Sequence, residues 1–372
     1  MKKLLTGAIA MLALAAAAPA EAEGLKLDIG GEFYGYALAT DQDEAVAVTD
    51  DIRGFDFRKE TELHFSGEIT LDNGLTVGAH FETDADIEEN GSLFEESYVY
   101  FSGNWGRVNF GEEDGATYLM QVAAPSADSN IDGLRAYINT FDLGGAAAGQ
   151  AYTSDRLDYD SVISGKANKL TYFTPVFNGF QAGVTYTPAV TDDPNDGLAA
   201  VNTDNDDDEY GSSYEVAVRY EGDWDGVGVN AGAGFAHANQ EDDTNQTGIT
   251  DDRAAWNVGL DLDIGAFGIG ASYSEDNNGR DTQGDTDILV VGADYTTGAY
   301  KLGLSYLSRD DESGSGLGNT VDTEISRITG GVTYNYGPGM SFRGSIAYLE
   351  VDPATGTDLD GYQVAIGTQV KF

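Results

Sequence analysis

Apolar and polar residues alternate with a period of two along most of the chain. The clearest stretches are residues 62–71, 214–221, 256–264 and 362–372. In each of them one set of alternate positions is apolar and often aromatic, whereas the other set is polar, charged, or only glycine and alanine. This period is typical of β-strands with two different faces. Helical periodicity is nearly absent past residue 22, so the pattern predicts an all-β protein.

Connections of two kinds join the predicted strands. Seven are tight turns rich in glycine, asparagine and aspartate, at residues 72–74, 103–106, 178–179, 222–226, 265–268, 297–298 and 337–339. Such turns are hairpin signals. Eight are longer, polar and acidic, at residues 40–57, 85–93, 112–166, 189–212, 238–252, 277–285, 310–322 and 352–359. Short and long connections alternate strictly along the chain.

Seven short and eight long connections join 16 strands. Strict alternation puts the short turns and both chain ends at one rim and the long loops at the other, which is the topology of outer-membrane β-barrels. Closure leaves no unpaired strand edge in hydrocarbon, and a barrel of about 16 strands encloses an aqueous channel. We therefore predict a 16-stranded antiparallel transmembrane β-barrel. A soluble two-domain β protein is the alternative.

The first 22 residues have the form of a secretory signal peptide. Two lysines precede an apolar run at residues 4–18, a proline ends the run, and small residues suited to signal peptidase follow. We expect cleavage after Ala22, with cleavage after Ala20 as the alternative, so that residues 23–372 form a single barrel domain. Past residue 22 no run of 18 apolar residues occurs, which excludes helical membrane spans.

Charge and composition narrow the function further. The chain has 64 acidic and 19 basic residues, a net charge of −45, which disfavours nucleic acid as a partner and favours cations. Two interpretations remain: a surface adapted to a saline habitat, and a functional preference for cations. The 49 glycines and 21 tyrosines with only 7 prolines favour short strands, tight turns and aromatic girdles over disorder. The absence of cysteine excludes disulfide and thiolate chemistry.

The longest connection, residues 112–166, is the candidate constriction of the pore. It lies between predicted strands at residues 107–111 and 167–174, and its residues 116–124 have helical character. Connections of this length usually have a function, and an exposed one would be prone to proteolysis. We expect it to fold into the lumen and set a negative field there; the alternative is an acidic external loop. The candidate residues are Glu112, Glu113, Asp114, Asp128 and Asp132.

Basic side chains are expected on the wall that faces these carboxylates. They fall on the polar set of alternate positions, which should point into the lumen: Lys26, Arg58, His64, Lys169, Arg219 and Arg343. A basic wall opposite an acidic loop gives a transverse field with which polar solutes can align. The alternative is that these bases only neutralise neighbouring carboxylates.

The sequence contains no recognisable catalytic constellation, so an enzyme such as an outer-membrane protease or phospholipase is not expected. His64 and His80 lie on the two arms of one predicted hairpin, both at lumen positions. A zinc pair there would need a third ligand, which the sequence does not indicate, so we interpret both as polar lumen residues. No cofactor is predicted. Acidic strings such as residues 204–209 suit only loose Ca²⁺ binding, because they lack the spacing of an EF-hand loop.

Three stretches of the sequence match a known pattern. Residues 97–111 resemble the segment that leads into the constriction loop of general diffusion porins of Gram-negative bacteria, and residues 168–180 resemble the strand-turn-strand motif that follows it. The ending in Phe372 is similar to the outer-membrane assembly signal. The chain resembles the alphaproteobacterial branch of that family most. Many relatives have a base where Glu112 stands, which argues here against anion selectivity.

The resemblance implies a homotrimer of barrels in the outer membrane, each with its third loop folded into its lumen. It also implies contact with outer-membrane lipid and lipopolysaccharide, and with the barrel-assembly machinery. The predicted function is a passive channel for small hydrophilic solutes and ions, weakly cation-selective. A solute-specific porin and an adhesive or structural outer-membrane barrel are the alternatives.

Overall fold

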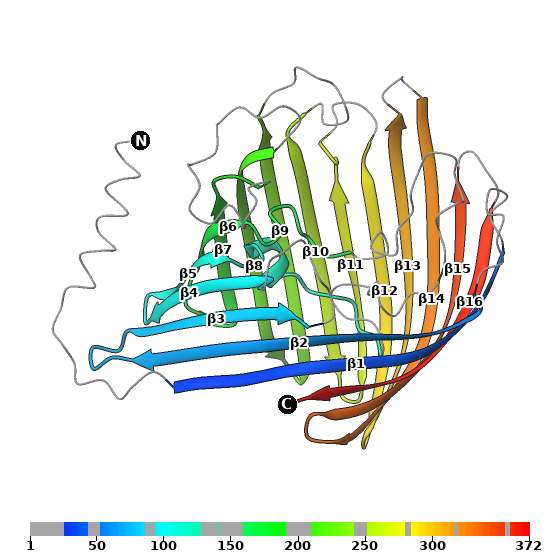
Figure 1. The fold of residues 1–372 in the computed structure, drawn as a ribbon, viewed down its shortest axis with the longest axis horizontal. Helices are drawn as coiled ribbons and strands as arrows, with labels where there is room; N and C mark the ends of the chain where they lie inside the picture. The colour runs from blue at the N-terminus through cyan, green and yellow to red at the C-terminus, as the bar shows by residue number, and fades with distance from the viewer. Residues whose placement is uncertain are drawn as a thin grey trace.

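The computed structural model describes residues 26–43, 53–85, 94–127, 141, 159–190, 210–241, 251–279, 284–315, 319–353 and 358–372. Within them, sixteen antiparallel β-strands close into one barrel, in which each strand pairs with its neighbours along the chain and β16 pairs with β1. Figure 1 shows this ring, with the blue N-terminal strands beside the red C-terminal ones. The predicted fold class and strand number are confirmed. The predicted signal peptide lies outside the described residues.

The elements follow in chain order. The strands are β1 (Lys26–Gln42), β2 (Phe55–Thr70), β3 (Thr76–Asp84), β4 (Glu96–Gly103), β5 (Gly106–Glu112), β6 (Asn168–Phe173), β7 (Phe180–Thr187), β8 (Tyr210–Trp224), β9 (Val227–Gln240), β10 (Arg253–Ile264), β11 (Phe267–Asp276), β12 (Thr286–Thr297), β13 (Tyr300–Ser315), β14 (Asn319–Gly337), β15 (Met340–Pro353) and β16 (Leu359–Lys371). A short helix, α2 (Ala116–Leu119), follows β5.

The predicted tight turns form the hairpin connections at one rim. At the turn between β8 and β9, Trp224 pairs with Val227, so only two residues make the loop. These residues, Asp225 and Gly226, have φ of 57° and 83°. Positive φ at both central residues supplies the twist that a two-residue hairpin needs, and aspartate and glycine tolerate it. These connections could therefore be predicted from the sequence, because the residue types at each turn fit the backbone angles that the turn requires.

Two predicted boundaries are wrong. The acidic stretch 310–322 is mostly not loop, because β13 and β14 continue as a paired ladder out to Ser315 and Asn319. Main-chain hydrogen bonds hold such a ladder whatever the side chains, so acidic composition alone does not end a strand. The helix predicted at residues 116–124 stops at Leu119, because from Met120 on the main chain lies directly against glycines of the wall strands, a contact that a helix surrounded by its own side chains would not make.

The outward set of alternate positions forms an apolar surface. Large apolar side chains such as Phe57 and Ile346 are exposed on it. Aromatic rings pair across neighbouring strands near both rims: the Phe267 and Tyr295 centroids lie 4.8 Å apart beside a turn, and those of Trp256 and Tyr273 lie 5.1 Å apart near the other end. Such aromatic girdles are typical of the two membrane interfaces of a barrel. Among the described residues, no helix has the length and apolarity needed to cross a membrane.

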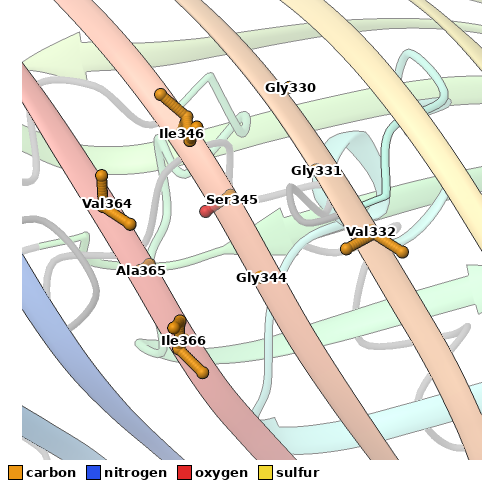
Figure 2. A pocket seen from close by; sticks show the side chains of 9 residues that line it. All are labelled: Gly330, Gly331, Val332, Gly344, Ser345, Ile346, Val364, Ala365 and Ile366. Carbon is orange, nitrogen blue, oxygen red and sulfur yellow. The ribbon is translucent and has the colours of Figure 1, made fainter.

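A shallow hollow interrupts this outer surface over β14, β15 and β16 (Figure 2). Gly330 lies opposite Ile346 there, and Gly344 lies between Val332 and Ile366. The hollow therefore arises because two glycines replace side chains in an apolar face. The space at Gly330 is open, since an added Cβ would meet only the Cδ1 of Leu304, at 3.9 Å.

The strand ends near the loop rim depart from simple alternation, because their inward residues are also apolar. Leu38, Ile325, Leu349 and Val351 are fully buried at such positions, in a cluster with ten other residues: Tyr34, Tyr36, Ala124, Phe141, Tyr159, Ile288, Val290, Leu307, Leu359 and Ala365. Three of them, Ala124, Phe141 and Tyr159, belong to the predicted constriction loop. The barrel thus has an apolar core inside its outer half, and it packs this loop against the wall. Burying one such large side chain contributes about 1.5–3 kcal/mol.

Candidate pore constriction

The described parts of the predicted constriction loop lie inside the barrel (Figure 1). Residues 113–127, called here the inward segment, leave β5, form α2 against β7, β8 and β9, and continue along the inner wall. At its far end Thr333 of β14 donates a 2.6 Å hydrogen bond to the main-chain oxygen of Ala127. Residues 159–167, called the return segment, lead back to β6. The inward and return segments therefore lie where the sequence predicted the loop to fold, inside the barrel.

Glycines on the inner wall receive the inward segment. A Cβ added at Gly259 of β10 would lie 2.0 Å from the main-chain oxygen of Val122, and one at Gly292 of β12 would lie 2.0 Å from that of Pro125. The same holds on β9 and β13, where added Cβ atoms at Gly232 and Gly303 would meet main-chain atoms of Met120 and Ala127. Only residues without a Cβ allow two backbones to approach so closely. These four positions, the glycine track, fix how near the wall the segment lies.

Glu215 of β8 anchors the start of the inward segment. Its carboxylate accepts hydrogen bonds from the Thr117 main-chain N–H at 3.0 Å and the Thr117 hydroxyl at 2.6 Å. It also accepts one from the Ser164 hydroxyl of the return segment, at 2.5 Å. Thr185 of β7 accepts from the Ala116 N–H at 2.9 Å. One buried carboxylate therefore holds both arms of the loop, because an ionised acceptor strengthens each of these bonds.

A second anchor lies where the loop leaves and rejoins the wall. Lys166 of the return segment lies 3.2 Å from the carboxylate of Asp114 and also pairs with Glu96 of β4. These three residues are called the anchoring cluster. Lys169 of β6 is buried beside it and donates to the main-chain oxygens of Glu113 and of Gly165, the latter at 2.6 Å. Glu113 is also held by Asn109, whose amide donates to it at 2.6 Å.

Burial sets the protonation of this region. It raises the pKa of Asp114 to about 6, despite the opposing charge of Lys166. It also raises the pKa of Glu113, against the hydrogen bond from Asn109. Burial would lower the pKa of Lys166, but the carboxylates of Asp114 and Glu96 outweigh it and raise that pKa above its ordinary value. Lys166 therefore stays charged while Asp114 titrates in a mildly acid range.

The register of β5 changes the expected part of Glu112. This residue pairs with Ser97 of β4 and Asn168 of β6, on the same set of positions as the exposed, outward Phe110 and Leu170. The chain turns inward only after it. This register gives no support to the expectation that Glu112 adds charge to the constriction. The loop instead enters the lumen through Glu113 and Asp114.

The predicted basic residues lie on the inner face beside acceptor groups. The contacts are Arg58 to Asp56 at 3.1 Å, Arg219 to Glu221 at 3.7 Å, His64 to Glu82 at 2.9 Å, and Arg343 to the amide oxygen of Gln369 at 2.5 Å. Lys169 is buried against main-chain oxygens. For Arg58 and Arg219 these contacts favour the interpretation that the bases neutralise neighbouring carboxylates. The side chain of Lys26 and the whole of Asp128 and Asp132 lie outside the described residues.

The chain forms a closed sixteen-stranded barrel with an inward-folded loop, and its sequence matches that of a known family. The family described as Gram-negative porin matches residues 8–354. The chain belongs to the Gram-negative porin family. This porin is therefore an outer-membrane β-barrel channel and not an enzyme. A comparison with curated proteins finds no match.

Solved porin structures share the fold. An anion-selective porin from Comamonas acidovorans has a TM-score of 0.60 and 19% identity, covering 94% of this chain and 100% of its own. OmpF of Salmonella typhi in complex with daunomycin has a TM-score of 0.60 and 20% identity, covering 94% and 98%. OmpT of Vibrio cholerae has a TM-score of 0.59 and 15% identity, covering 94% and 98%. At these identities the likeness concerns the fold alone.

Of the residues that anchor the loop, Glu113, Asp114 and Lys169 were predicted site residues of this porin, whereas Glu215, Lys166 and Glu96 were not. Glu215 looks like any lumen-facing carboxylate of an alternating strand, and nothing local marks it as a partner of Thr117, which lies 98 residues away. The glycine track did leave a signal, because Gly232, Gly259, Gly292 and Gly303 all fall on the polar set of alternate positions. Glycine in a strand interior often marks the close approach of another backbone.

Proposed function

We propose that this porin is a passive channel for small hydrophilic solutes and ions that weakly prefers cations. The observation that carries the proposal is that several lumen bases, such as Arg58 and Lys301, lie in direct contact with a carboxylate, while further carboxylates line the same wall. On β10 and β12, for example, Asp261 interacts electrostatically with Asp263, Asp294 and Lys301, and Lys301 lies 2.7 Å from Asp294. Three carboxylates against one ammonium leave local negative charge, which attracts cations into a confined pore.

The oligomeric state, the family branch and the partners of this porin are inferred from its sequence. We infer a homotrimer and membership of the alphaproteobacterial branch from the three matching stretches, with lipopolysaccharide and the barrel-assembly machinery as further partners. The exposed ring of Phe372 and the alternating apolar residues before it support the last of these, and Phe372 closes the barrel seam through paired main-chain bonds to Gly31, each 3.0 Å. The inward segment favours a diffusion channel over an adhesive barrel, for which we expect no such loop.

The selectivity can be measured directly. In planar bilayers with a KCl gradient, the reversal potential should have the sign of a pore that passes K⁺ more readily than Cl⁻. The double variant D261N/D263N should shift it toward zero, because two lumen carboxylates are lost. D72N, in an exposed turn, is the matched control and should leave it unchanged. A preference for Cl⁻ in the unmodified porin would overturn the proposal.

Mild acid should weaken the cation preference. Because the pKa of Asp114 is raised to about 6, its negative charge is present at pH 7 and is lost as pH falls through that value, while Lys166 stays positive. The reversal potential should therefore move toward zero between about pH 7 and pH 5. D114N should remove most of this pH dependence. An equal pH dependence in D114N would show that other carboxylates are responsible.

A further inference from the structure

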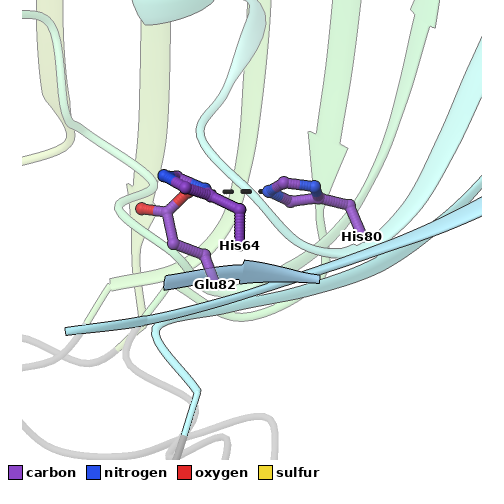
Figure 3. A group of neighbouring side chains, drawn as sticks. All are labelled: His64, His80 and Glu82. Carbon is purple, nitrogen blue, oxygen red and sulfur yellow. Dashed lines mark ion pairs between the residues drawn. The ribbon is translucent and has the colours of Figure 1, made fainter. Parts of the chain in front are cut away.

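Two histidines and one glutamate meet on the inner face of the β2–β3 hairpin (Figure 3). His64 pairs in register with Glu82, and His80 precedes Glu82 by two residues, so all three side chains leave the sheet on one side. That side is the lumen, because the alternate residues Phe65 and Phe81 pair on the opposite face. Glu82 is the third ligand that a metal site requires, and only the register of the hairpin brings it beside His64.

The donor atoms converge on one carboxylate oxygen. The Nδ1 of His64 lies 2.9 Å and the Nε2 of His80 lies 3.6 Å from the same Oε2 of Glu82. One ligand atom from each of the three residues lies within 4.8 Å of the others. Zinc bonds of 2.0–2.2 Å in tetrahedral geometry place neighbouring ligand atoms about 3.3 Å apart. Small side-chain rotations would therefore bring all three onto one ion.

The other nitrogen of each imidazole also has a partner. The Nδ1 of His80 is hydrogen-bonded to the hydroxyl of Ser66 at 2.8 Å, and the Nε2 of His64 lies 3.7 Å from a carboxylate oxygen of Glu62. Metal-bound histidines have this arrangement, in which a neighbouring oxygen accepts a hydrogen bond from the second ring nitrogen and orients the ring. When an ion binds, the proton of each ring can stay on that second nitrogen, so that the Nδ1 of His64 and the Nε2 of His80, which lie toward Glu82, are the atoms that bind the ion.

We propose that His64, His80 and Glu82 bind a divalent transition-metal ion, with Zn²⁺ as the ion of choice, on the lumen wall. Two imidazole nitrogens select Zn²⁺, Ni²⁺ or Cu²⁺ over Ca²⁺ and Mg²⁺, which prefer oxygen ligands. All three side chains are partly exposed, at 30%, 19% and 15%, so the ion reaches the site from the pore water. A water molecule completes the fourth position.

The site adjoins the anchor of the constriction loop. Glu82 lies opposite Glu96 on β4, and Glu96 pairs with Lys166 of the anchoring cluster. A bound dication therefore adds positive charge beside the root of the inward segment. The expected consequence is a lower cation preference of the pore when Zn²⁺ is present.

Calorimetric titration of the full-length, detergent-solubilised porin with ZnCl₂, after removal of metals by EDTA, tests the proposal. Excess CaCl₂ in the buffer occupies the many carboxylate-only sites, so the remaining heat reports sites with nitrogen ligands. We expect one tight class of Zn²⁺ sites per chain. S66A should weaken it by about 10–100-fold, as loss of an orienting partner does, and H80Q should weaken it further.

His237 provides the matched control. It is the third histidine of the chain, lies on β9 near Asp252 and belongs to no such cluster among the described residues. H237Q should bind Zn²⁺ as the unmodified porin does. Unchanged binding in H80Q, or an equal loss in H237Q, would overturn the proposal. E82Q, which differs by one atom, serves in place of H80Q if the latter fails to give the circular dichroism of a folded barrel. Binding does not depend on ion selectivity, so this outcome and that of the reversal-potential test are independent.

Discussion

Replacing Gly259 by alanine should lower both the stability of the barrel and its single-channel conductance. The new Cβ would lie 2.0 Å from the Val122 main-chain oxygen and 2.9 Å from its carbonyl carbon. Both are backbone atoms, so no side-chain rotation relieves the overlap. The inward segment must move by roughly an ångström or more to reach ordinary contact distance. It can only move toward the pore axis, because the barrel wall stands on the other side, and the open cross-section then shrinks.

The cost in stability is that of an overpacked core, about 1–3 kcal/mol. Urea-induced unfolding in detergent micelles and conductance in planar bilayers measure the two effects. G330A is the matched control, because its Cβ would meet only Leu304 Cδ1, at 3.9 Å, on the lipid side. Glycine in a strand is less favourable than alanine by about 0.5–1 kcal/mol, so G330A should be neutral or slightly stabilising. Similar behaviour of the two variants would mean that the glycine track does not position the segment.

Replacing Glu215 by alanine should release the constriction loop from the wall. The variant removes the acceptor for three hydrogen bonds and leaves the Thr117 N–H, the Thr117 hydroxyl and the Ser164 hydroxyl without it. Leaving a buried donor without its acceptor costs about 1–3 kcal/mol. The loss is local to the loop, since the strand ladder of β8 is made of main-chain bonds. The barrel should therefore persist while the loop moves.

Limited proteolysis and single-channel recording detect that motion. A non-specific protease should cut E215A within residues 113–167 faster than the unmodified porin, and the open-channel current should become noisier. E221A is the matched control, on the same strand and face but with a side chain that is 74% exposed. E215Q keeps one acceptor oxygen and should fall between the two. A quiet, protease-resistant E215A would show that the apolar contacts inside the outer half hold the loop by themselves.

Strand positions, turns and barrel closure were predictable because they depend on near neighbours. Alternation shows which residues share a face, and pairs such as Asp225 and Gly226 reveal a two-residue hairpin through their φ requirement. The apolar core inside the outer half also left a trace, since Ile288, Leu289, Val290 and Val291 are apolar on both faces. Such a run indicates a strand buried on both sides. The acidic stretch at 310–322 was wrongly predicted to be a loop, because acidic composition does not prevent main-chain hydrogen bonding between two strands.

For the candidate site, the sequence predicted only which segment forms the constriction and that this segment is acidic. By itself the sequence determined that the chain forms a barrel, and it predicted that the longest connection, residues 112–166, folds inward. Tertiary structure decided that Glu112 pairs on the outward side, that Glu215 holds both arms of the loop, and that Glu82 joins His64 and His80. The physical reason is that strand alternation is fixed by residues two apart, whereas these contacts depend on the register and closure of the whole ring. Hydrogen bonds between residues far apart in the chain exist only once every intervening strand is paired.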